Sequence, residues 1–309
     1  MLDIVVLFFL FGLLAGLLRS ELKLPPALYD TLSLFLLLAI GLKGGVGLSQ
    51  QPLLPLLPQL GLVILLGIGQ TLIGFALLRV KLNRIDAAAT AAHYGSVSVA
   101  TFAVGVNWLT VRGVSFESQL SIFLAVMEIP AILVGIVLAR GISRDTRWRV
   151  LAHEAFLGKG VTLLIGGMMI GYLAGPEGVA PLKPLFVDLF KGALALFLLE
   201  MGLIVARQSR DLRHHGLFLL GFALLMPLAS AWLGLATGSL MGLSLGGLTL
   251  LATLAASASY IAVPAAMRIA LPQANPGLSL SAVLGVTFPF NIMLGIPLYY
   301  QWAHFFAES

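Results

Sequence analysis

The sequence predicts an all-α integral membrane protein with ten transmembrane helices in two inverted five-helix repeats and discontinuous helices in its core. Of its 309 residues, 59% are hydrophobic and 10% are charged. The mean hydropathy is +1.03, which water-soluble domains do not reach. Apolar runs of about 20 residues, the length that crosses a bilayer, recur along the chain. Two of these runs are interrupted by small polar residues.

The apolar segments occupy most of the chain and leave no room for a soluble domain. They run over 3–18, 27–48, 53–78, 85–109, 116–139, 155–174, 182–206, 216–240, 246–270 and 278–302. The first segment begins with acidic Asp3 and has no basic leader. We therefore expect a retained span and not a cleaved signal peptide.

Basic residues gather on alternate connections between the segments. Fourteen of the 18 Lys and Arg lie there, and the other four are Lys43, Arg112, Lys183 and Lys191. Because cytoplasmic loops collect Lys and Arg, we expect a multi-pass protein of the inner (plasma) membrane with both termini outside the cytoplasm. Basic residues that flank apolar runs indicate a lipid bilayer as the partner, and no nucleic acid.

A basic link divides the chain into two halves of five apolar segments each. An odd number of spans turns the second half upside down relative to the first, the inverted-repeat plan of many secondary transporters. The echo of SVS at 96–98 by SAS at 257–259 supports this plan. We expect one repeat over 1–142, a cytoplasmic link over 143–154 and the other repeat over 155–309.

Two interrupted segments, one per half, form the candidate binding site. Residues 255–268 (AASASYIAVPAAMR) contain Pro264, which removes a backbone N–H and clashes with the preceding turn, so the helix is expected to bend or break. Residues 93–101 (HYGSVSVAT) carry a matching Ser-x-Ser. Broken helices in corresponding positions of two halves indicate a transporter site. The candidate substrate-binding residues are Ser96, Ser98, Thr101, Ser257, Ser259 and Tyr260.

Oxygen-bearing side chains also surround prolines in two further spans. Glu128 precedes Pro130, which frees backbone carbonyls, and hard cations such as sodium prefer oxygen ligands. The same carboxyl can alternatively carry a proton or pair with Lys43. Thr287 and Asn291 flank a proline in the second half. The candidate sodium ligands are Ser98, Thr101, Glu128, Ser259, Thr287 and Asn291.

Lys43 and Glu200 place charges near the ends of apolar runs, and each has two interpretations. Lys43 either extends its ammonium toward the membrane surface, or attracts an anion or pairs with Glu128 or Glu200. Glu200 is equally open to a charge-pair role. His93 opens the first interrupted segment, where a lone histidine is most often a packing residue.

The motifs of enzymes and ATP-driven pumps are absent. His153-Glu154 lacks the second histidine of a zinc protease motif, and no glycine-rich loop ends in Gly-Lys-Ser or Gly-Lys-Thr. We therefore expect no enzymatic activity and no cofactor, with sodium as the coupling ion if transport is active.

Four motifs give the chain a family resemblance. They are IGLKGG at 40–45, YGSVSVAT at 94–101, MEIPA at 127–131 and AASASYIAVPAAMRIALPQANP at 255–276. With these motifs, and through nearly all ten spans, the chain resembles the sodium-dependent bicarbonate transporters of the SbtA type.

The resemblance implies sodium-coupled symport of bicarbonate into the cell by a homotrimer. It implies a gate part over about 1–50 and 155–207, and a mobile core part over about 53–140 and 214–303. It places substrate and sodium positions at Ser98, Thr101, Ser257 and Ser259, with an acid at Glu128.

The chain departs from this family at three positions. Cyanobacterial members have an acidic residue where this chain has Tyr260, a Ser where it has Ala100 and a Thr where it has Lys43. The family also implies a small PII-like regulatory partner, but the short link 143–154 argues against its binding here.

The mechanism that we expect brings half-helix N-termini together around one small anion, because these ends carry partial positive charge and free N–H groups. Sodium is expected to complete the site only when the anion is present. Two alternatives stay open. One is a sodium- or proton-coupled transporter of another small anion or carboxylate, including exchange through Glu128, and the other is a passive anion channel.

Overall fold

The computed structural model is all-helical and describes most of the chain. The described residues are 3–141, 149, 153, 156–211 and 216–307. Apart from residues 149 and 153, the expected link 143–154 lies outside them, as do residues 214 and 215 at the start of the expected core part.

Helices lie in each of the ten expected apolar segments. In order they are α1 (Ile4–Leu17), α2 (Pro26–Leu48), α3 (Leu56–Leu78), α4 (Arg84–Gly95), α5 (Val99–Val111), α6 (Leu120–Arg140), α8 (Lys159–Val179), η1 (Ala180–Leu182), η2 (Pro184–Asp188), α9 (Phe190–Asp211), α10 (Gly216–Leu240), α11 (Leu245–Ala256), α12 (Ala262–Ala270), α13 (Pro276–Ala282), η4 (Val283–Thr287), α14 (Phe288–Phe290), η5 (Asn291–Gly295) and α15 (Ile296–Ala307).

Within the described residues, seven helical stretches are long and apolar enough to cross a membrane. The apolar helices α1 and α11 are shorter, with 14 and 12 residues. The structure therefore confirms an all-helical, multi-pass protein with discontinuous helices. Ten spans in an inverted repeat remain a prediction.

Local sequence signals explain where several helices begin. Asp3 caps α1 by accepting the N–H of Val5 at 3.1 Å. Asn83 caps α4, and Ser244 caps α11. Each short polar side chain satisfies an N–H that the first helical turn leaves without an acceptor.

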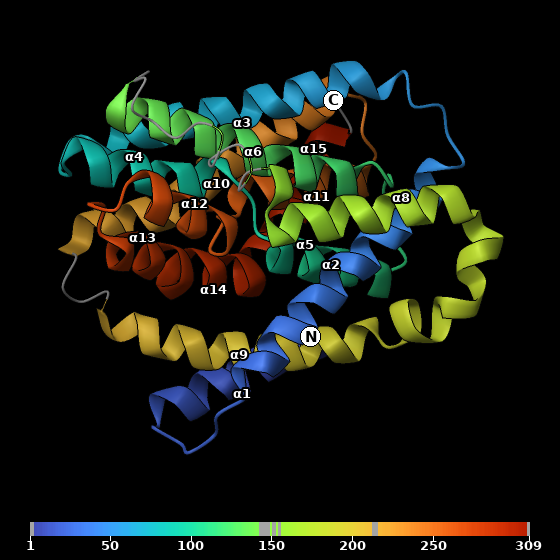
Figure 1. The fold of residues 1–309 in the computed structure, drawn as a ribbon, viewed down its shortest axis with the longest axis horizontal. Coiled ribbons are helices and arrows are strands. Elements are labelled where there is room, and N and C mark those ends of the chain that lie inside the picture. The colour runs from blue at the N-terminus through green and yellow to red at the C-terminus, as the bar shows by residue number, and fades with distance from the viewer. Residues whose placement is uncertain (1–2, 142–148, 150–152, 154–155, 212–215, 308–309) are drawn as a thin grey trace.

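Four helices pack as two reciprocal pairs. α1 runs along α9 and α2 runs along α8, so the first helix of each half packs against the second helix of the other half. Glycines permit this close approach, since a Cβ at Gly45 or Gly171 would overlap the backbone of the facing helix. Figure 1 shows α1 and α9 along one edge of the molecule, beside the larger bundle that holds α3 to α6 and α10 to α15.

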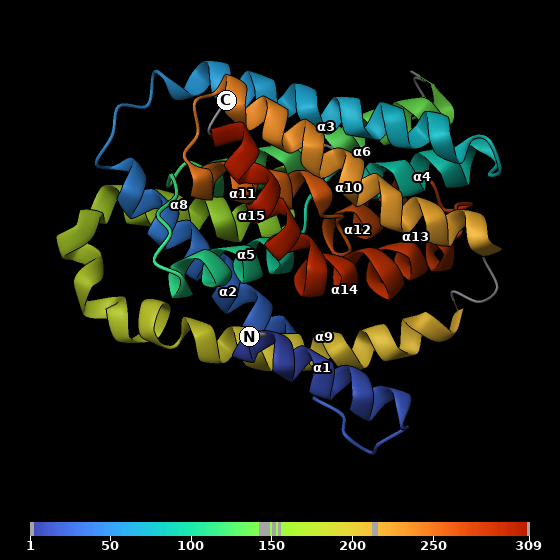
Figure 2. The same cartoon turned by 180° about the vertical axis from the view of Figure 1, so that it is seen from behind.

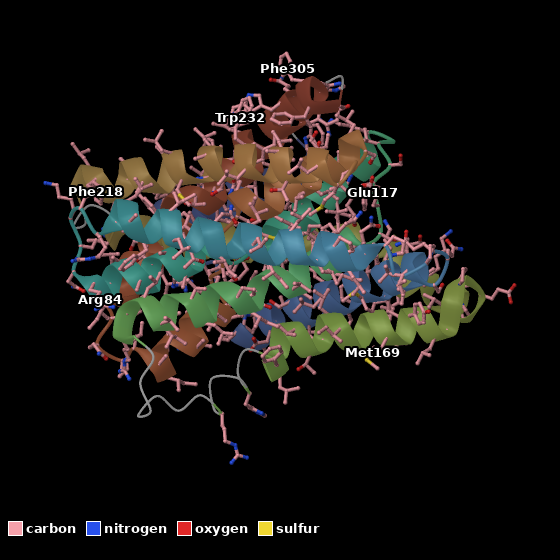
Figure 3. The ribbon with its side chains drawn as sticks, turned by 90° about the horizontal axis from the view of Figure 1, so that it is seen from above. Arg84, Glu117, Met169, Phe218, Trp232 and Phe305 are labelled. Carbon is pink, nitrogen blue, oxygen red and sulfur yellow. The ribbon has the colours of Figure 1, made fainter. Side chains whose placement is uncertain are left out.

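In the larger bundle, α3, α4 and α6 pack together from the first half, and α10, α11 and α15 from the second. The view from behind in Figure 2 shows α10 and α15 lying over α11. In Figure 3, Met169, Trp232 and Phe305 project from the periphery. They are 59%, 47% and 70% exposed, which fits side chains that face lipid.

Candidate functional site

Both predicted helix interruptions are present. α4 ends at Gly95 and α5 begins at Val99, whereas α11 ends at Ala256 and α12 begins at Ala262. The second interruption comes before Pro264 and not at it. Pro264 lies in the first turn of α12, where its missing N–H leaves no intrahelical bond unmade.

The two interruptions lie against each other in the bundle. α5 packs beside α11, and α12 packs beside α4. The N–H of Ser98 donates to the Ser257 hydroxyl at 2.9 Å, and the N–H of Ser259 donates to the His93 carbonyl at 2.9 Å. Backbone groups released by each break are thus satisfied from the other half of the chain.

His93 strengthens this crossing. Its Nδ1 lies 2.6 Å from the Ser259 carbonyl oxygen. Because a carbonyl can only accept, Nδ1 carries the proton of this bond. The packing role expected for His93 is consistent with this buried position, but its hydrogen bond also fixes the second break, which the sequence did not indicate.

The predicted serines cap the half-helices on both sides of the crossing. The Ser98 hydroxyl accepts the N–H of Thr101 at 3.2 Å and its hydroxyl at 3.0 Å. The Ser259 hydroxyl accepts the N–H of Val263 at 3.3 Å. Ser257 donates its hydroxyl to the Leu254 carbonyl at 2.7 Å.

The caps do not use every N–H at the starts of α5 and α12. The first N–H groups of a helix have no intrahelical acceptor. Those of Val99 and Ala100 in α5, and of Ala262 in α12, have no partner among the described residues. These donors lie at the positive ends of two half-helix dipoles, where an anion is stabilised.

Three buried polar atoms near the crossing also lack a hydrogen-bond partner within the described part of the chain. They are Oγ of Ser96, Oε1 of Gln70 and the hydroxyl of Tyr260. The Tyr260 hydroxyl lies toward Ser98 but outside hydrogen-bonding geometry. Since a buried polar atom without a partner is costly, these atoms are suited to a ligand.

Gln70 is the residue that sequence reasoning missed. Its Nε2 donates to the Ala255 carbonyl at 2.8 Å, at the C-terminal end of α11. Asn291 donates in the same way to the Ala256 carbonyl at 2.8 Å. Gln70 is fully buried in the middle of α3, and an amide in the middle of an apolar span is the signal that could have identified it.

Two candidate sodium ligands have structural partners. The Asn291 side-chain oxygen accepts the Tyr299 hydroxyl at 2.6 Å. The Thr287 hydroxyl donates to the Ala223 carbonyl at 2.7 Å, so the Tyr94 hydroxyl, 2.8 Å away, donates to it. Both side chains brace the broken segments, and each oxygen retains a free lone pair.

Glu128 lies outside this hydrogen-bonded group. It lines a cavity of about 150 Å³, together with Val99 at the start of α5 and Ile261 before α12. No hydrogen bond or ion pair joins Glu128 to another described residue. Glu128 is thus a neighbour of the crossing and not a member of it.

Lys43 lines a different and larger cavity, of about 450 Å³, between α2 and α5. Its Nζ lies 5.6 Å from the centre of the Phe116 ring. Within the described residues, no ion pair joins Lys43 to Glu128 or Glu200. Glu200 is buried in α9 with one carboxylate oxygen unpartnered.

The arrangement suits a small oxyanion and a monovalent cation better than a transition metal. No three His, Asp or Glu side chains of the described residues gather as a metal site. The crossing instead offers N–H donors at two helix starts and hydroxyl and amide oxygens around them.

Comparison with known proteins places the chain in a family. No curated protein matches the sequence. One family model matches residues 4–304, which is nearly the whole chain. Combined with the interrupted helices and their buried polar atoms, this match shows that the chain belongs to the Na⁺-dependent bicarbonate transporter superfamily.

Proposed function

We propose that this protein is a secondary active transporter that takes up bicarbonate together with sodium by alternating access. Membership of the superfamily supports both the ion and the substrate. The observation that carries the proposal is the crossing of two interrupted helices, which leaves N–H donors and polar oxygens without partners among the described residues.

Bicarbonate lies between the starts of α5 and α12 in this proposal. The N–H groups of Val99, Ala100 and Ala262 bind its charged oxygens, and the dipoles of both half-helices stabilise the charge. Ser96 and Tyr260 add hydroxyls for which the described part of the chain supplies no other partner. No arginine is required, because backbone donors supply the recognition.

Sodium binds beside the anion in this proposal. The oxygens available to it come from Ser98, Thr101 and Ser259, with Oε1 of Gln70 as an additional ligand. Because Ser98 caps the helix that holds the anion, binding of one ion orders the site of the other. This mutual dependence couples the two ions.

The reciprocal pairs α1–α9 and α2–α8 form the gate part in our proposal, and the remaining helices form the mobile core. Their exchange of partners between halves supports the inverted repeat. The orientation with both termini outside and the homotrimer expected from the resemblance belong to the same proposal.

Uptake of labelled bicarbonate into proteoliposomes tests the function. We expect saturable uptake with a sodium gradient and little uptake when potassium replaces sodium. Equal uptake in both salts would refute sodium coupling. Unsaturable flux without sodium would identify a passive anion channel, and competition by small carboxylates stronger than by bicarbonate would identify another substrate.

A further inference from the structure

The cavity that contains Glu128 lies on a seam between the two groups of helices. α2 and α8 line one side, and α5, α6 and the region that begins α12 line the other. Any movement of the proposed core against the proposed gate therefore changes the surroundings of Glu128.

Glu128 enters this seam without a partner. The residue is 8% exposed, and it forms no hydrogen bond or ion pair with a described residue. A Cβ added to Gly160 of α8 would lie 3.8 and 3.9 Å from the two carboxylate oxygens, so the carboxyl points toward that helix at a position where no side chain intervenes.

The titratable groups that face Glu128 do not neutralise it. From α2 come Tyr29 and Asp30, and from α8 comes Lys159. Nζ of Lys159 lies 3.3 Å from Asp30 and is thereby paired with another carboxylate. α5 and the start of α12 contribute apolar side chains, those of Val99, Ile261, Ala262 and Ala265, and the helix-start N–H groups of Val99 and Ala262, which the proposed anion occupies.

A buried carboxylate without a counter-charge costs several kcal/mol, and such a group becomes neutral instead. A metal cation would need several oxygen ligands. The Ser33 hydroxyl, which also lines the cavity, already donates to the Tyr29 carbonyl at 2.8 Å. Apart from Tyr29, Asp30 and Lys159, the remaining lining is glycine and aliphatic.

We propose that Glu128 is a proton-binding site that controls the seam. With the seam closed, the carboxyl holds a proton; as the seam opens to water, it releases that proton to the water on the side of Lys159 and becomes a carboxylate. This inference rests on the proposed alternating access, and it gives Glu128 a proton in place of the sodium ion expected from the sequence.

The absence of cysteine from the chain allows a direct test. Ala265→Cys places one thiol on the cavity wall, and its labelling by a water-soluble thiol reagent reports opening of the seam. We expect labelling to accelerate with rising pH more than at Glu21→Cys, a control in the exposed turn between α1 and α2 that corrects for ionisation of the thiol itself.

Adding Glu128→Gln, which mimics the protonated acid, is expected to abolish the excess acceleration and to hold labelling at the slow rate seen in acid. Glu128→Asp should retain a pH response, and Glu177→Gln, which removes an exposed acid from α8, should leave the response intact. Elution as a single peak in detergent shows that each variant folds.

An unchanged pH response in Glu128→Gln would overturn the proposal. Labelling that responds to sodium at fixed pH, and loses this response in Glu128→Gln, would identify a sodium site instead. Since labelling requires neither bicarbonate nor a gradient, sodium-independent uptake in proteoliposomes would refute the proposed function without altering this result.

Discussion

The backbone N–H of Ser98 and the hydroxyl of Ser257 lie 2.9 Å apart, although the two residues are 159 positions apart in the chain. Each residue borders the interruption of its own helix, and Ser257 also donates to the Leu254 carbonyl. One hydroxyl therefore terminates α11 and fixes the residue that caps α5. The crossing is a single hydrogen-bonded unit, so a change on one side is transmitted to the other.

Ser98→Ala tests this unit. The substitution removes the cap of α5, which costs about 1 kcal/mol of stability, and removes a hydroxyl from the proposed sodium site. We expect folded protein with a slightly lower Tm and with sodium-dependent uptake reduced by at least about tenfold, the equivalent of one lost 1.4 kcal/mol interaction.

Ser49→Ala is the matched control for this prediction, because its exposed hydroxyl bonds only the carbonyl of Val46 at the end of α2. Its uptake should equal that of the unaltered protein. Full uptake by Ser98→Ala would remove Ser98 from the site.

Tyr260→Phe separates binding from stability. The hydroxyl has no hydrogen-bond partner among the residues that the structure describes, whereas the ring packs edge-on against Phe288 with centroids 5.7 Å apart. Removing only the hydroxyl leaves the packing intact and spares its burial cost, so Tm should be unchanged or higher. The KM for bicarbonate should rise several-fold. A fall in Tm with an unchanged KM would show that the phenol serves only packing.

The sequence predicted the interruptions because their signal is local. A Ser-x-Ser among small residues gathers hydroxyls at one point of an apolar run, which indicates a buried site or cavity there. Proline alone is a weaker signal, because Pro130 and Pro227 lie inside unbroken helices. Ser96, Ser98, Ser257 and Ser259 were identified on this basis, and the structure brings their segments together.

The partners of these serines could not be predicted, since they depend on how the halves pack. The bonds of Gln70 to Ala255 and of Thr287 to Ala223 join different helices. The surroundings of Glu128 could not be predicted for the same reason. Its position before Pro130 suggested an ion site, but only the tertiary structure shows that it faces Gly160 and the helix pair α2–α8. Local sequence fixes where a helix breaks, and tertiary packing fixes what the break contacts.

Gln70→Leu tests the additional sodium ligand. Leucine fits an apolar span but supplies neither the bond to the Ala255 carbonyl nor the unpartnered Oε1. We expect the sodium concentration for half-maximal uptake to rise by about tenfold or more, since hydrogen bonds and ion contacts of this kind are worth about 1.5–3 kcal/mol. Gln70→Glu should restore part of the affinity, because a carboxylate oxygen can replace the amide oxygen.

Gln59→Leu removes another amide from α3, one that contacts Gln119 at 3.4 Å away from the crossing. This control should retain the sodium dependence of the unaltered protein. If Gln70→Leu does so as well, Gln70 only supports the end of α11.

Lys43→Gln tests whether the larger cavity recruits the anion. Lys43 is the one charged side chain among the described residues that line this cavity of about 450 Å³, so it sets the local potential. A positive charge raises the concentration of anions near an entrance, and salt screens that effect. We therefore expect Lys43→Gln to slow uptake at low bicarbonate and low ionic strength, with kcat and half-maximal sodium concentration unchanged.

Lys43→Arg should behave as the unaltered protein, and Lys191→Gln, which removes a lysine from a separate groove beside α1, should have no effect. Loss of the sodium dependence of uptake in Lys43→Gln would contradict this role. A lysine that only attracts the anion to the larger cavity takes no part in sodium binding at the crossing.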